Sequence, residues 1–83
     1  ADNRPLAQLI EELIDERVLQ EVAREYKKGR RLFVGTTQLN AQRLVIWDMG
    51  AIAASGSPHA LNLFRKVLLA SASLPATFPP QYF

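Results

Sequence analysis

The chain has no cysteine among its 83 residues, so no disulfide framework can stabilise it. This absence also removes cysteine usage as a guide to the cellular compartment. A chain of this length forms one domain at most, and a small domain without a disulfide or a metal needs an economical core. The apolar patterns described below do not indicate such a core.

A strong charge of one sign is also missing. The formal net charge is +2, which is too modest to indicate binding to nucleic acid. Aromatic residues make up 8% of the chain and do not form the basic and aromatic surface on which bases stack. Hydrophobic residues, at 48%, are typical of a globular protein. We therefore expect no nucleic-acid partner.

Neither a signal peptide nor a membrane span is predicted. The first nine residues, ADNRPLAQL, lack a basic leader followed by an apolar run. The longest stretch without a charged residue, 67–83, carries three prolines and several hydroxyls. Unpaired backbone groups in lipid cost several kcal/mol each, so this stretch does not predict a span. The localisation of the protein stays open.

No catalytic motif is present in the sequence. A nucleophile elbow needs Gly-x-Ser-x-Gly, and none of the glycines at positions 29, 35, 50 and 56 brackets a serine at that spacing. The only histidine, His59, falls in the first turn of a predicted helix. We expect it to be a solvated residue rather than a general base or a metal ligand.

The carboxylates also favour structural roles. One cluster comprises Glu11, Glu12, Asp15 and Glu16. It lies on the polar side of a predicted helix, with Arg17 and Arg24 as expected partners, and so indicates a solvated face rather than a metal site. Asp48 follows an apolar strand. Without a nucleophile nearby, we expect it to cap the next turn rather than to act in catalysis.

The first helical region covers residues 5–28. Apolar residues recur there at three- and four-residue spacing, namely Leu6, Leu9, Ile10, Leu13, Ile14, Val18, Leu19, Val22, Ala23 and Tyr26. Asn3 is a candidate cap for the first turn, and Asp15 is a second candidate. The region therefore predicts one helix, or two helices with a turn near Ile14. Gly29 is a natural end.

Two strands are predicted next, over residues 32–37 and 44–47. The short link at residues 40–42 predicts an antiparallel hairpin. Both strands are apolar on both faces over several residues, a pattern typical of strands that are covered from two sides. Gly35 within the first strand indicates either a bulge or a close approach of backbone.

A second helical region follows. Residues 49–54 predict a short helical turn that Gly56 ends, and Ser57 with Pro58 predicts the start of a helix running to about residue 72. The second half of this helix, residues 67–72, has no polar stripe. Such a pattern predicts burial on all sides.

The apolar surface exceeds what two strands can cover. At roughly 25 cal/mol per Å², exposing several Leu, Val and Phe side chains would offset the whole stability of a small domain. We therefore expect the missing layers to come from a partner, from a second copy, or from the rest of a longer chain.

The only basic run comprises Lys27, Lys28, Arg30 and Arg31. It fits a helix end that complements the helix dipole, followed by a solvated turn. Contact with anionic lipid headgroups is the alternative interpretation, which leaves a membrane-surface partner open.

Three stretches together resemble the middle of a patatin-like phospholipase domain, especially its bacterial branch. They are GRRLFVGTTQLN (29–40), LVIWDMGAIAASGSP (44–58) and LFRKVLLASASLPATFPPQYF (63–83). The most specific part is the alanine- and serine-rich helix end that leads through Leu-Pro into Phe-Pro-Pro. The resemblance is weaker over the first 28 residues.

The resemblance implies a three-layer α/β/α fold and hydrolysis of lipid acyl esters by a serine–aspartate dyad. In that family the serine lies in a Gly-x-Ser-x-Gly elbow, a glycine-rich loop holds the oxyanion, and the aspartate lies in an Asp-Gly-Gly or Asp-Gly-Ala motif. This chain contains none of these motifs. Residues 1–83 therefore match an internal portion of one such domain, between the serine and the aspartate, with no boundary inside it.

Several expectations follow from this resemblance. The chain carries no catalytic, cofactor or metal residue and is inactive alone, while its partners are the remainder of the parent polypeptide and, for the parent, a lipid or ester substrate. Residues 74–80 would form a rigid segment that positions the strand with the aspartate. Leu74 and Phe78 are candidates for the wall of an acyl pocket. The alternatives are a small non-enzymatic interaction module or dimerising domain, and a membrane-surface peptide.

Overall fold

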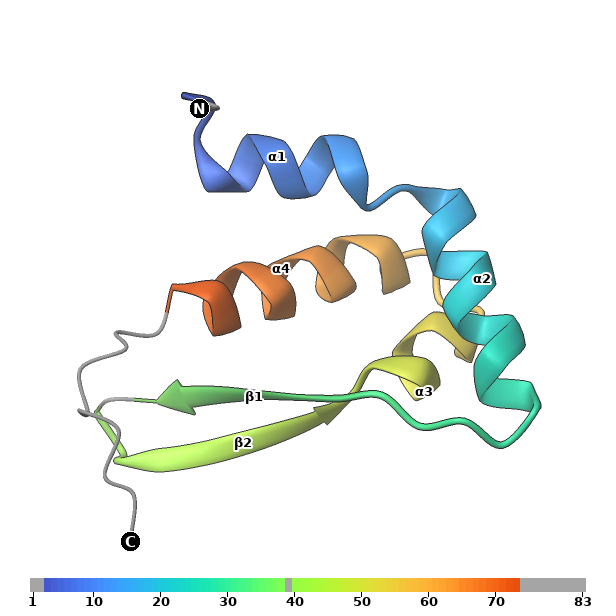
Figure 1. Cartoon of the computed structure of the whole chain (residues 1–83). Coiled ribbons are helices and arrows are strands. Elements are labelled where there is room, and N and C mark those ends of the chain that lie inside the picture. The colour runs from blue at the N-terminus through green and yellow to red at the C-terminus, as the bar shows by residue number, and fades with distance from the viewer. Residues whose placement is uncertain (1–2, 39, 74–83) are drawn as a thin grey trace, which may run out of the picture.

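A computed structural model describes residues 3–38 and 40–73 of the chain. The elements follow in the order α1 (Leu6–Leu13), α2 (Glu16–Lys27), β1 (Phe33–Gln38), β2 (Arg43–Asp48), α3 (Met49–Ala54) and α4 (Ala60–Ala72). Helix α4 lies between α1 and the β1–β2 hairpin, while α2 and α3 pack together at one end (Figure 1). The expected mixed α/β fold class is confirmed.

The first helical region consists of two helices. Asp15 begins α2, and its Oδ1 accepts a hydrogen bond from the backbone N–H of Val18 at 3.0 Å. The expected cap at Asn3 is wrong, because α1 has Pro5 at its N-cap position and no side-chain cap bond. Asn3 lies too far before the first turn to serve it. Helix α2 ends as expected, with Gly29 at a positive φ of 96°.

The two strands form the expected antiparallel hairpin. The register pairs Phe33 with Asp48 and runs without interruption to Gln38 and Arg43. The expected bulge at Gly35 is therefore absent from this register, and the group that approaches Gly35 closely is a side chain and not backbone. A Cβ added there would lie 3.3 Å from Cδ1 of Leu44, its diagonal neighbour on β2.

Helices α3 and α4 follow the hairpin closely. Asp48 ends β2, and its Oδ1 accepts from the N–H of Ala51 at 3.1 Å, so the expected capping role is confirmed. Gly56, at a φ of 74°, interrupts the helical path. Helix α4 begins slightly later than expected. Ser57 Oγ accepts from the N–H of His59 at 3.0 Å, and His59 occupies the N-cap position.

The core lies where α2, α3, α4 and the hairpin meet. Its buried members are Leu19, Met49, Ala60, Phe64 and Val67. Among residues 67–72 only Val67 is buried by the described chain, while Ala70 and Ala72 are exposed, so burial of this helix end on all sides stays a prediction that depends on further polypeptide. Helix α1 and the hairpin contact α4 from opposite sides (Figure 1).

The described part of the chain leaves many large apolar side chains exposed. They are Leu6, Leu13, Leu32, Phe33, Leu44, Ile46 and Leu63. These side chains lie mainly on α1 and on the hairpin, at the two outer layers of the fold. The mixed α/β arrangement, with apolar surface on both outer layers, is consistent with an incomplete α/β fragment.

Candidate functional site

The hairpin has one covered face and one open face. On the covered face, Val34 and Trp47 pack against the buried core, and Trp47 Nε1 donates to Thr36 Oγ1 at 2.9 Å. Because side chains alternate along a strand, the neighbours of these residues point the other way. This outer sheet face comprises Phe33, Gly35, Thr37, Leu44, Ile46 and, at the end that leads into α3, Asp48. No described helix or strand covers this face, since Phe33, Leu44 and Ile46 on it are exposed.

The outer sheet face is strongly apolar. Phe33, Leu44 and Ile46 are 58%, 67% and 58% exposed. The side chains of Leu44 and Ile46 lean towards Gly35, within 3.3 and 3.6 Å of the position that a Cβ would take. The glycine thus lets the β2 side chains spread across β1, so that the middle of this face is apolar.

A second apolar surface lies between α1 and α4. It is a groove of about 320 Å³. Its lining consists of Leu6, Leu9, Ile10, Leu13, Ile14, Leu68 and Ala72. No charged side chain lines it, so it has no group that could orient or polarise a substrate.

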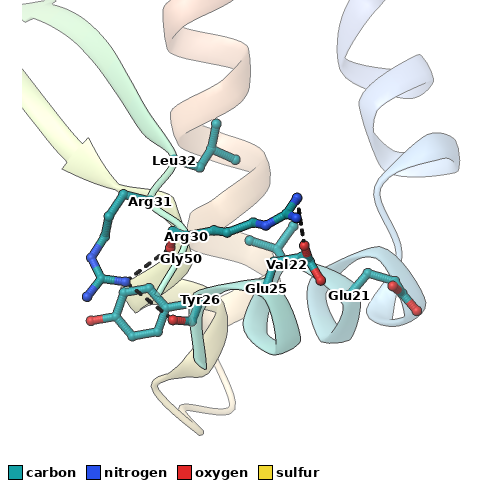
Figure 2. A pocket seen from close by; sticks show the side chains of 8 residues that line it. All are labelled: Glu21, Val22, Glu25, Tyr26, Arg30, Arg31, Leu32 and Gly50. Atoms are coloured by element: carbon teal, nitrogen blue, oxygen red, sulfur yellow. Dashed lines mark hydrogen bonds and ion pairs between the residues drawn. The ribbon is translucent and has the colours of Figure 1, made fainter. Parts of the chain in front are cut away.

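A hollow of about 290 Å³ lies between α2, the start of α3 and the turn that precedes β1 (Figure 2). Its lining consists of Glu21, Val22, Glu25, Tyr26, Arg30, Arg31, Leu32 and Gly50. Figure 2 shows Arg30 and Arg31 pointing to different sides, Arg30 towards Glu25 and Arg31 over the ring of Tyr26. Sequence reasoning did not identify this hollow, because its shape depends on how α2 packs against Gly50 and on the path of the turn that precedes β1.

The carboxylate of Glu25 in this hollow forms ion pairs with neighbouring basic side chains. Glu25 Oε2 accepts from Lys28 Nζ at 3.2 Å, and Glu25 Oε1 lies 3.1 Å from Arg30 Nη1. The hydrogen bond and charge of Lys28, followed by the charges of Arg30 and Arg24, hold the pKa of Glu25 below its ordinary value. A carboxyl group with a lowered pKa stays ionised at neutral pH and is unsuited to general acid chemistry.

The remaining basic residue of the hollow also has local partners. The guanidinium of Arg31 lies 4.4 Å from the centroid of the Tyr26 ring and donates to the Tyr26 carbonyl oxygen at 3.3 Å. The basic run therefore closes the end of α2 onto the following turn, as the structural interpretation expected.

His59 shares a hollow of about 290 Å³ with two serines, Ser55 and Ser57. The hydroxyl of Ser55 donates to the Ile52 carbonyl oxygen at 2.7 Å, and the hydroxyl of Ser57 accepts from a backbone N–H. Both hydroxyls thus form hydrogen bonds with backbone groups. His59 is exposed, as expected, and no carboxylate lines this hollow to orient it.

The acidic cluster is exposed on α1 and the start of α2, as expected for a solvated face. Glu12 pairs with Arg4 and accepts from Gln8, while Asp15 caps α2. The expected partner Arg24 instead binds Glu21 at 2.6 Å, three residues away on the same helix.

Within residues 3–38 and 40–73, no three His, Asp or Glu side chains gather as a metal ion would require. In the same residues, no helix combines the length and the apolar character needed to cross a membrane.

The two candidate acyl-pocket residues, Leu74 and Phe78, and the segment 74–80 lie outside the described residues. The described part of the chain thus has exposed apolar surfaces and several ion pairs between neighbouring side chains. Within it, no serine hydroxyl forms a hydrogen bond with a side chain that could act as a general base. Compared with known proteins, the chain matches no family model, no curated protein and no solved structure.

Proposed function

We propose that these residues form a structural segment of a lipid acyl hydrolase of the patatin-like type. The segment supplies a hairpin and its covering helices, while the catalytic serine and aspartate belong to other parts of the parent polypeptide. The proposal draws on the resemblance of residues 29–83 to that family. The observation that carries it is the open, apolar outer sheet face.

An uncovered face of this kind suits the middle layer of a larger fold. Helix α4 covers the inner face, and a three-layer α/β/α domain would place a further helical layer on the outer face. Burying Phe33, Leu44 and Ile46 there would contribute about 1.5–3 kcal/mol for each side chain. Such a layer would therefore stabilise the whole domain as well as the hairpin.

The chemistry of the parent would follow the usual course of acyl transfer. A serine would attack the ester carbonyl, an aspartate would take its proton, and backbone amides would hold the oxyanion. The segment would contribute to this reaction by holding the sheet and α4 in place. None of its described side chains is assigned a chemical step.

The test compares two proteins in an assay with a short-chain p-nitrophenyl ester. One is the full-length product of the open reading frame that encodes these residues, and the other is the 83-residue chain. We expect hydrolysis by the first and none by the second. Turnover by the 83-residue chain, or an inactive but folded full-length product, would overturn the proposal.

A dimerising domain is the second candidate, favoured by the flat outer sheet face, which could pack on its own copy. Sedimentation velocity separates the two. A cooperatively folded, symmetric dimer of the 83-residue chain supports the dimerising domain. Irregular aggregation of that chain supports the segment of a larger fold.

A further inference from the structure

The backbone of β1 has a row of groups that point away from β2. The N–H of Met49 donates to the carbonyl oxygen of Leu32 at 2.8 Å, and this pair continues the hairpin register by one step. Bonded and non-bonded pairs alternate along an antiparallel ladder. The N–H and C=O groups of Phe33, Gly35 and Thr37 therefore face outward.

No other described backbone meets these outward groups. Within residues 3–38 and 40–73, the backbone hydrogen bonds outside the helices and the hairpin do not include them, and the sheet has two strands. Such a row of free donors and acceptors has the geometry that a further strand would pair with.

The two edges of the hairpin differ in composition. Strand β1, FVGTTQ, has no charged residue, whereas β2, RLVIWD, has Arg43 at one end and Asp48 at the other. Edge strands are commonly protected by charged side chains, and interior strands lack them. The composition of β1 is thus that of an interior strand, and that of β2 fits an edge.

The position of α4 agrees with this difference. Helix α4 packs against β1, and its contact with β2 is slight (Figure 1). A helix with its side chains is about 10–12 Å across. It therefore spans roughly two strands, which lie about 4.8 Å apart. Because α4 lies nearer to β1 than to β2, it leaves room for a further strand beside β1 under the same helix.

We propose that the free edge of β1 pairs with one further β-strand, which the polypeptide that completes the α/β domain supplies. This inference rests on the proposed function in one respect, that the same larger domain provides the strand. The hydrogen-bonding groups of Phe33, Gly35 and Thr37 dictate an extended backbone as the occupant. The edge of β2 remains the outer edge of the sheet on that side.

Amide hydrogen exchange, measured residue by residue by NMR in the full-length product, tests the pairing. We expect the amides of Gly35 and Thr37 to exchange at least roughly 100-fold more slowly than the outward amides of Leu44 and Ile46 on β2. Those two amides are the internal control, because they belong to the same hairpin and no strand is expected beside them. The proposal is overturned if Gly35 and Thr37 exchange as fast as Leu44 and Ile46, or if slow exchange is confined to Leu44 and Ile46.

A matched pair of proline variants adds a second measurement. Thr37 and Leu44 face each other across the hairpin, and proline at either position removes an outward N–H without touching the ladder between the strands. In the full-length product, Thr37→Pro should remove the slow exchange at Gly35, and Leu44→Pro should retain it. Equal effects of the two variants would count against the proposal. If Thr37→Pro does not fold, the exchange rates of the unmodified full-length product still decide.

The exchange measurement tests the proposed strand, and the esterase assay tests the proposed hydrolase, so either proposal can fail without the other. Slow exchange at Gly35 and Thr37 in a protein without esterase activity would support the strand and reject the hydrolase. Esterase activity with fast exchange at both amides would support the hydrolase and reject the strand.

Discussion

The ring of Tyr26 on α2 lies directly against Gly50 at the start of α3. A Cβ built on Gly50 would lie 2.5 Å from Cδ1 of Tyr26, far inside van der Waals contact. The missing side chain is therefore what lets the two helices approach. The same ring carries the guanidinium of Arg31 on its face, so one tyrosine joins α2, α3 and the turn before β1.

Replacing Gly50 by alanine should destabilise the fold. The added methyl group collides with Tyr26, and overpacking of this kind costs about 1–3 kcal/mol. The helix propensity of alanine offsets about 1 kcal/mol of that cost. Chemical denaturation of Gly50→Ala measures the difference from the unmodified chain.

The control for this prediction is the double variant with Tyr26→Ala. In that background the collision is gone, and Gly50→Ala should be neutral or stabilising. An equal loss of stability in both backgrounds would mean that the contact with Tyr26 is not the cause.

Removal of the Arg65 side chain should release α1. Arg65 Nε donates to the carbonyl oxygen of Ile14 at 2.7 Å, and its Nη2 donates to that of Glu11 at 2.9 Å. These bonds satisfy carbonyl groups at the end of a helix that has no buried residue. We expect Arg65→Ala to lower the free energy of unfolding by about 2 kcal/mol and to reduce the helical circular dichroism.

Lys66→Ala is the matched control, because Lys66 is the exposed neighbour of Arg65 on α4. It should leave both measurements nearly unchanged. Similar losses for the two variants would show that charge on α4, and not the bonds to α1, stabilises the helix.

The stability contributed by Glu25 should depend on pH. Because Lys28, Arg30 and Arg24 lower the pKa of Glu25 in the folded chain, its ionised form is favoured by folding. The contribution is present above the ordinary pKa of 4.5 and is lost as the pH falls through the lower folded-state value. Glu25→Gln should lower the Tm slightly at pH 7 and leave it unchanged at a pH below both values.

Glu16→Gln provides a comparison for the pH series, since Glu16 is also exposed on α2 but lies at its first turn. A pH-independent difference between Glu25→Gln and the unmodified chain would contradict the assignment to the ion pairs.

A charge on the outer sheet face should affect the two proteins differently. Leu44 is largely exposed in the 83-residue chain, so Leu44→Lys should change its stability little and improve its solubility. In the full-length product we expect a loss of at least about 2 kcal/mol, because the side chain would be buried there. Denaturation curves of both proteins, with Gln20→Lys on exposed α2 as control, measure this difference. Equal effects of Leu44→Lys in both would mean that nothing covers the face.

Local signals in the sequence predicted the elements well. Asp15, Asp48, Gly29 and Gly56 each act within a few residues of their own position, through a cap bond or a positive φ, and their roles could be predicted from neighbours alone. The hairpin followed from two apolar runs joined by a short link.

Contacts between distant segments could not be predicted in this way. Arg65 reaches Ile14 across 51 positions, and the fit of Tyr26 on Gly50 depends on the angle between two helices. The pattern of residues 67–72 showed that the helix end is apolar on all sides, but it could not show which polypeptide covers it. The hydrolase chemistry and the roles of Leu74 and Phe78 stay predictions.

Strand β2 passes into α3 with no residue between them, since Asp48 ends the strand and Met49 begins the helix. A slip of the hairpin by one residue would therefore turn α3 by about 100° about its own axis. Such a turn would swing the fully buried Met49 out towards solvent. The direct junction therefore couples the register of the hairpin to the burial of Met49. A hairpin in the wrong register would lose that buried side chain from the core, which disfavours the wrong register.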